Sequence, residues 1–192
     1  MNKPTRTVWN PARLDAAAFA QADASLEGQT AVAELERLVE DLHLPDDGPV
    51  PGQVAWALRG EMRAPRTGQQ PDVWLHLQAS VTVPLTCQRC LGPVDASLEV
   101  DRWFRFVADE ATAEAQDDDC EEDLLALEPR PDMLAVLEDE LLMSLPLVPL
   151  HDTCPEPVPL GDPAPIVEAA PERPHPFAQL ARLRGKGPDG AS

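Results

Sequence analysis

Three segments of the chain alternate between apolar and polar residues with a period of two. In residues 73–86 every odd-numbered position is apolar and most even-numbered positions are polar, and shorter alternations run through residues 54–62 and 94–106. This period turns one face of a strand toward a core and the other toward water, which is typical of antiparallel sheets. The connections, residues 64–71 and 88–93, contain Pro and Gly. The pattern therefore predicts a three-stranded antiparallel meander, whose long strands must twist and bend toward a partial barrel.

Apolar residues spaced three and four apart predict helices on either side of this meander. Residues 28–43 are expected to form a short strand up to Ala33 and then a helix. Residues 131–145 carry a leucine stripe between Pro131 at the first helical position and Pro146 after the last one. An Ala-rich helix is expected over residues 14–22, and a short strand over residues 124–127.

These elements predict an α+β fold with flanking helices and a Pro-rich, partly disordered C-terminal tail. We expect an N-terminal arm over residues 1–27, an α+β domain over residues 28–154 and the tail over residues 155–192. The tail contains a short basic amphipathic segment that is too short to be stable alone and that can order on a partner. Its candidate partner-binding residues are Phe177, Arg182, Arg184 and Lys186.

Charge is distributed unevenly along the chain. The formal net charge is −19, yet residues 1–13 and 173–187 contain basic residues and no acid. The remainder holds eight basic residues against 34 acidic ones, which predicts repulsion of bare phosphate backbone and attraction of basic partners. Residues 109–123 hold nine acids and no base, which indicates a solvated, disordered loop or, alternatively, a docking surface for a basic partner.

Two pairs of residues have the spacing of metal ligands. Cys87 and Cys90 flank a predicted turn, and His151 and Cys154 form a second pair 60 residues later. Together they would supply the four ligands of a closed tetrahedral zinc site. The alternative is that Cys87 and Cys90 are reduced thiols in a tight turn. A redox-active pair is less favoured, because Gly and Pro follow Cys90 closely where such motifs open a helix.

No catalytic constellation is recognisable in the sequence. It has no Gly-rich nucleotide-binding loop and no nucleophile-elbow pattern. The acids at positions 138–140 are expected to form a solvent-facing patch on their helix. The first residues lack the apolar run of a signal peptide, and no stretch reaches the ~18 apolar residues of a membrane helix. We therefore expect a cytoplasmic, non-membrane protein that is not an enzyme and has no small-molecule substrate.

Three motifs in order resemble the bacterial YceD family, the large ribosomal RNA subunit accumulation proteins. They are Cys87-Gln88-Arg89-Cys90-Leu91, then Glu138-Asp139-Glu140-Leu141-Leu142 running into the Leu-Pro-rich stretch up to His151, and the terminal Pro176-Phe177-Ala178 with its following leucines. The resemblance covers roughly residues 28–187. Many relatives end in a Cys-rich tail that looks zinc-binding, whereas the tail of this chain is Pro-rich.

The resemblance implies a non-enzymatic role in the synthesis, processing or stability of 23S ribosomal RNA. Because the body is acidic, we expect RNA contact to be made by the basic ends, or indirectly through a basic ribosomal protein or biogenesis factor. Two other interpretations remain open at this point. One is a small structural zinc-binding protein with an unrelated partner, and the other is a hydrolase or redox enzyme that uses the cysteine pair.

Overall fold

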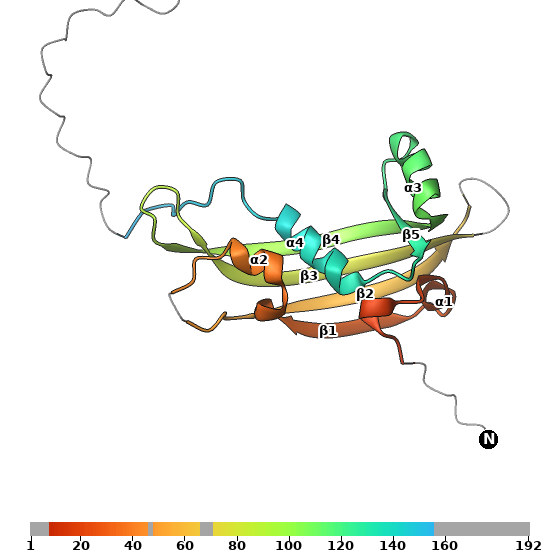
Figure 1. Ribbon diagram of the computed structural model, residues 1–192, viewed down its shortest axis with the longest axis horizontal. Helices are drawn as coiled ribbons and strands as arrows, with labels where there is room; N and C mark the ends of the chain where they lie inside the picture. The colour runs from red at the N-terminus through yellow and green to blue at the C-terminus, as the bar shows by residue number, and fades with distance from the viewer. Residues whose placement is uncertain (1–7, 46–47, 66–70, 156–192) are drawn as a thin grey trace, which may run out of the picture. The chain divides into compact units, whose positions relative to one another are not determined.

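The computed structural model describes residues 8–45, 48–65 and 71–155. The described chain forms five strands and four α-helices, joined in part by short 3-10 turns (Figure 1). The strands are β1 (Ser25–Ala31), β2 (Gln53–Arg63), β3 (Asp72–Thr86), β4 (Pro93–Asp109) and β5 (Asp123–Glu128). The helices are α1 (Ala16–Gln21), α2 (Glu36–Glu40), α3 (Glu110–Gln116) and α4 (Met133–Met143). The predicted Pro-rich tail lies outside the described residues.

The strands form one sheet in the order β1-β2-β3-β4-β5. The first four pair with their neighbours in antiparallel fashion, whereas β5 pairs parallel to β4. The prediction of an α+β fold built on an antiparallel meander is confirmed, with β1 and β5 added at its two edges. The parallel pairing is possible because α3 lies between β4 and β5 in the sequence and lets the chain reverse direction.

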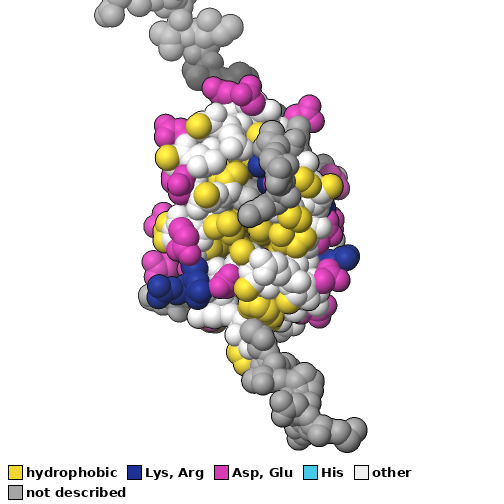
Figure 2. Space-filling view, turned by 90° about the vertical axis from the view of Figure 1, so that its right-hand side faces the viewer, with side chains coloured by type: hydrophobic (Ala, Val, Ile, Leu, Met, Phe, Trp, Pro, Cys, Tyr) yellow, Lys and Arg dark blue, Asp and Glu magenta, His cyan; other side chains and the backbone are white. Residues whose placement is uncertain are grey.

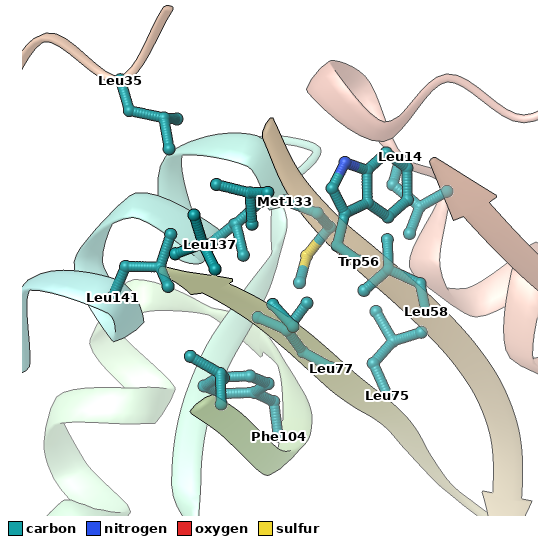
Figure 3. Close-up of a cluster of buried hydrophobic side chains, with 14 of the residues drawn as sticks. Leu14, Leu35, Trp56, Leu58, Leu75, Leu77, Phe104, Met133, Leu137 and Leu141 are labelled. Atoms are coloured by element: carbon teal, nitrogen blue, oxygen red, sulfur yellow. The ribbon is translucent and has the colours of Figure 1, made fainter. Parts of the chain in front are cut away.

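One face of the sheet carries the hydrophobic core, as the alternation predicted. Leu75 and Leu77 of β3 and Phe104 of β4 are almost completely buried beneath α4, whose Leu137 and Leu141 are fully buried. Figure 3 shows these side chains converging from the sheet and the helix. In Figure 1, α2 and α4 lie across the sheet, and α3 lies at its β4–β5 edge. The opposite face of β1–β4 presents mostly exposed polar residues.

The segment expected to be an N-terminal arm contributes to this core from residue 9 onward. Leu14 and Phe19 are fully buried, and Trp9 packs edge-on against Phe19 with ring centroids 5.2 Å apart. Close packing requires glycine at position 60, because a Cβ there would lie 2.6 Å from the Phe19 ring and 2.8 Å from the Ala20 Cα. The predicted Ala-rich helix is thus present as α1, and it packs on β2 and β3 instead of extending from the domain.

The acidic segment 109–123 is ordered, so our expectation of a disordered loop is wrong. Asp109 caps α3 by accepting the backbone N–H of Thr112 at 2.8 Å, and Ala113 is buried against the sheet. Arg105 lies beneath this segment, where its guanidinium donates to Cys120 Sγ at 2.9 Å and approaches Glu122 to 3.3 Å. A buried cation thus gives the acidic segment a point of attachment that composition alone does not reveal.

The acids at positions 138–140 do not form the expected solvent-facing patch. Glu138 and Glu140 are only 9% and 7% exposed, whereas Asp139 is exposed. Burial raises the pKa of Glu140, and the Arg102 guanidinium, 3.5 Å away, partly offsets this effect. The arginines that pair with Glu138 and Glu140 come from α2 and β4, so the sequence of this helix alone does not predict their burial.

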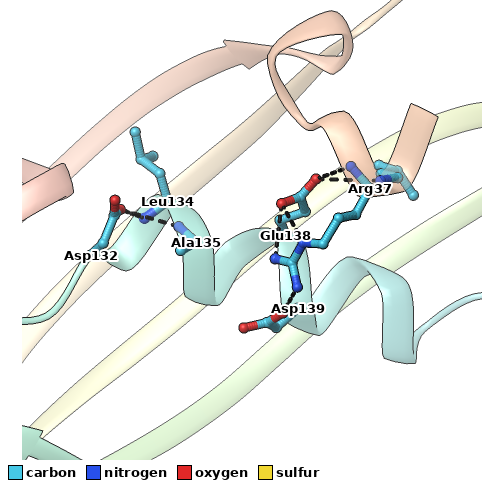
Figure 4. Close-up of polar contacts among 7 residues, drawn as sticks. Arg37, Asp132, Leu134, Ala135, Glu138 and Asp139 are labelled. Atoms are coloured by element: carbon cyan, nitrogen blue, oxygen red, sulfur yellow. Dashed lines mark hydrogen bonds and ion pairs between the residues drawn. The ribbon is translucent and has the colours of Figure 1, made fainter. Parts of the chain in front are cut away.

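Glu138 caps the N-terminus of α2 from a different helix. One carboxylate oxygen accepts the backbone N–H groups of Arg37 and Leu38 at 2.8 and 3.3 Å, and the other accepts the Arg37 Nε at 3.0 Å (Figure 4). The residue preceding α2 provides no side-chain cap, so Glu138 satisfies donors that would otherwise lack partners. In α4 itself, Asp132 is the N-cap and the helix begins at Met133, two residues after the Pro131 start that we expected.

We predict that Glu138→Ala will lower the free energy of unfolding by about 2 kcal/mol, because it removes charge-assisted hydrogen bonds to buried backbone donors. Urea denaturation followed by circular dichroism will measure this loss. Asp139→Asn is the matched control, because Asp139 also pairs with Arg37 but is half exposed, and surface pairs contribute roughly 0–1 kcal/mol. Equal losses for the two variants would contradict the capping role.

Candidate metal centre and acidic surface

The Cys87–Cys90 pair lies in the turn that connects β3 to β4. The Cys87 N–H donates to the Gly92 carbonyl at 2.9 Å, and the Leu91 N–H donates to the Cys87 carbonyl at 2.9 Å. Leu91 adopts a left-handed backbone conformation with φ of 60°, a conformation that a branched residue rarely adopts. These hydrogen bonds hold the turn in a shape in which both thiols point toward the chain that follows α4.

The His151–Cys154 pair arrives on that following chain. The segment is held against the turn by a backbone hydrogen bond from Gln88 N–H to the Pro149 carbonyl at 2.9 Å. This contact brings His151 Nδ1 to 3.4 Å from Cys90 Sγ. Arg89 approaches the Cys154 sulfur from the turn, at 3.9 Å. The 60-residue gap in sequence is therefore closed by β4, β5 and α4, which return the chain to the end of the sheet where it left.

The four predicted ligands form one cluster. The ligand atoms of Cys87, Cys90, His151 and Cys154 all lie within 4.8 Å of one another. A tetrahedral zinc ion with Zn–S bonds of about 2.3 Å places its sulfur ligands about 3.8 Å apart, so the spacing fits such an ion. Cys87 is fully buried and the other three are partly buried. This group can hold a metal ion. The fourth cysteine, Cys120, lies outside the cluster and accepts a hydrogen bond from Arg105.

Backbone geometry gives the two ends of the cluster different thiol chemistry. The backbone N–H of Cys90 lowers the pKa of Cys87 to about 5 against the opposing effect of burial, with further help from the backbone N–H groups of His151 and Arg89. Burial, followed by the neighbouring Cys90 and Cys87, raises the pKa of the Cys154 thiol. Backbone N–H donors around one sulfur stabilise the thiolate, which is the form in which cysteine binds a metal.

The arginines of the described residues are mostly engaged by carboxylates. The described residues contain eight arginines, no lysine and 27 acids. Six of the arginines form ion pairs with Asp or Glu; these are Arg37, Arg59, Arg63, Arg102, Arg105 and Arg130. Figure 2 shows acidic side chains spread over the surface in its view, with basic ones at few places. The predicted partner-binding residues Phe177, Arg182, Arg184 and Lys186 lie outside the described residues.

Sequence reasoning missed an aromatic cluster on the outward face of the sheet. The Arg63 guanidinium lies over the rings of both Trp74 and Trp103, 4.3 and 3.9 Å from their centroids. The His76 ring stacks on Trp103 at 4.2 Å and its Nε2 contacts Asp101 at 2.6 Å. These residues occupy outward positions of three strands, which the period-two pattern marks only as solvent-facing. Their contacts depend on strand register, which one strand's sequence does not contain.

Comparison with known proteins agrees with the resemblance seen in the motifs. A family sequence profile described as "Large ribosomal RNA subunit accumulation protein YceD" matches residues 75–184, more than half of the chain. A protein of that name from Haemophilus influenzae is 32% identical over 117 residues, which cover 57% of this chain and 64% of the relative. The chain thus aligns with less than two thirds of that relative's length.

Two further findings bear on the setting of this fold. No solved structure matches the chain. No helix of the described residues is long and apolar enough to span a membrane.

The profile match begins within β3, includes all four candidate metal ligands and extends into the basic C-terminal segment. On these grounds the chain belongs to the YceD family of large ribosomal RNA subunit accumulation proteins.

Proposed function

We propose that this protein supports the accumulation of 23S ribosomal RNA as a non-catalytic interaction factor in the cytoplasm. The family match over residues 75–184 carries this proposal. The relative from Haemophilus influenzae, named for accumulation of the large ribosomal subunit RNA, supports it.

The charge distribution favours a protein as the direct partner of the described body. Binding to nucleic acid depends on Lys and Arg that displace counterions from phosphates. Here only Arg13 and Arg89 lack a carboxylate partner among the arginines of the described residues. The body therefore suits a basic ribosomal protein or biogenesis factor, and the basic ends of the chain are left for any contact with RNA.

The metal cluster supports a structural role for zinc. Catalytic zinc sites keep one coordination position open for water or substrate, whereas this cluster supplies four protein ligands. Bound zinc would join the β3–β4 turn to the chain after α4 and neutralise thiolates that otherwise repel one another. Family membership argues against the interpretation as a zinc protein with an unrelated partner, so we treat zinc as a structural component of the rRNA factor.

We predict that cells depleted of this protein will contain less 23S relative to 16S rRNA, and that expression of the full chain will restore the ratio. RNA sequencing or gel quantification of total rRNA measures the effect. A variant truncated after residue 172 should fail to restore it, because it loses the basic segment that we expect to contact RNA. An unchanged ratio on depletion would overturn the proposed function.

We predict that the purified chain binds one equivalent of zinc. Cys87→Ser should lose the metal and lower the melting temperature by about 10 °C, since loss of a structural metal is among the most destabilising single changes and ~3 kcal/mol corresponds to a shift of this size. Metal analysis and thermal unfolding measure both effects. Cys120→Ser, which alters a thiol outside the cluster, should keep the zinc. Equal zinc contents in the two variants would contradict the site.

A further inference from the structure

The outward face of the sheet has a regular pattern that appears only when strand register is known. Two rows of side chains cross β1, β2, β3 and β4 side by side. The first row is Glu27, Ala57, Gln78 and Asp101, and the second is Gln29, Ala55, Ser80 and Glu99. In both rows the two inner positions on β2 and β3 are uncharged. The first row has a carboxylate at each end, Glu27 on β1 and Asp101 on β4, whereas the second has one at its β4 end, Glu99.

These rows line a groove of about 840 Å³ across the sheet, which we call the sheet groove. Its floor is low because β2 contributes only the methyl groups of Ala55 and Ala57 there. Three spacings between strands make it about 14 Å long, and carboxylates stand at both of its ends. No Lys or Arg is among the described residues that line it.

Contacts on one side hold the groove in shape. Asp101 accepts hydrogen bonds from Gln78 Nε2 at 3.0 Å and contacts His76 Nε2 at 2.6 Å, which fixes one end of the first row. The stacked aromatic cluster formed by Arg63, Trp74 and Trp103 lies next along the strands. Glu27 and Glu99, in contrast, are exposed and have no hydrogen-bond or ion-pair partner among the described residues. Hydrogen bonds therefore fix the Asp101 end of the groove, while the carboxylates of Glu27 and Glu99 remain available to a partner.

We propose that the sheet groove is a docking site for a Lys/Arg-rich segment of a partner protein. The helices α1, α2 and α4 pack on the opposite face, and the acidic segment covers Arg105 farther along β4. All the described residues that line the groove belong to β1–β4. Three carboxylates without a lining cation attract positive charge and repel phosphate. The small, uncharged floor lets a backbone approach while flanking basic side chains reach the carboxylates at either end.

This docking site deepens the proposed function, on which it rests, by naming where the basic partner binds. It also distinguishes between two acidic regions, the sheet groove and the segment 109–123. Both carry negative charge, but the carboxylates of the groove surround a concave surface, whereas α3 presents acids on an exposed helix. Shape, in addition to charge, should therefore decide where a basic segment binds.

The test uses a fluorescein-labelled ten-residue peptide of alternating Lys and Ala, titrated with the full chain at 150 mM salt. The double variant Glu27→Gln, Glu99→Gln should raise the dissociation constant about five-fold, the loss expected for two exposed ion pairs. The control Glu114→Gln, Glu121→Gln makes the same change in net charge on the acidic segment and should change it less than two-fold. Backbone amide shifts in NMR spectra should concentrate at Ala57 and Ser80.

Several outcomes would overturn the proposal. Equal weakening by the two double variants, or amide shifts centred on α3, would show that net charge alone attracts the peptide. Tighter peptide binding after removal of residues 173–192, with shifts at Ala57, would make the chain's own basic segment the occupant. Amide shifts at Ala57 on addition of a 23S rRNA fragment would make RNA the occupant. The ratio of 23S to 16S rRNA in depleted cells tests the proposed function separately. A failure of the docking site can therefore be told apart from a failure of the proposed role in rRNA accumulation.

Discussion

The carboxylate of Glu138 holds together the helical layer on which the rest of the fold depends. It caps α2 and binds Arg37, so that α2 and α4 are joined above the sheet. The position of α4 in turn determines where the following chain begins, and this chain delivers His151 and Cys154 to the β3–β4 turn. A single buried acid thus links the core to the metal cluster, because removing it would leave backbone donors of α2 without partners.

Ion pairing within the fold also determines what the surface can bind. Arginines from β2, β4 and α2 are engaged by acids of the same molecule, some of them buried. The acids greatly outnumber these cations, so the charge that remains free is almost entirely negative. This balance of charge is the basis of our proposal that the body binds basic proteins and that the basic ends of the chain are available for the polyanion.

The sequence predicted those features that depend on local pattern or on ligand chemistry. The alternation in 73–86 predicted β3 and its buried face, and residue type and spacing alone predicted the pairing of Cys87 and Cys90 with His151 and Cys154. The acids at 138–140 were misinterpreted because their partners come from distant elements. The sheet groove was missed for a related reason, since its rows join residues that are neighbours only through register.

The central claim is that the acidic body contacts protein and that RNA is contacted only by the basic ends. Ultraviolet cross-linking in growing cells, with the cross-linked peptides identified by mass spectrometry, tests it most directly because it reports which residues touch RNA. The account predicts RNA adducts on peptides from residues 1–13 or 173–187, and protein cross-links from the sheet. RNA adducts concentrated on β1–β4 would contradict it.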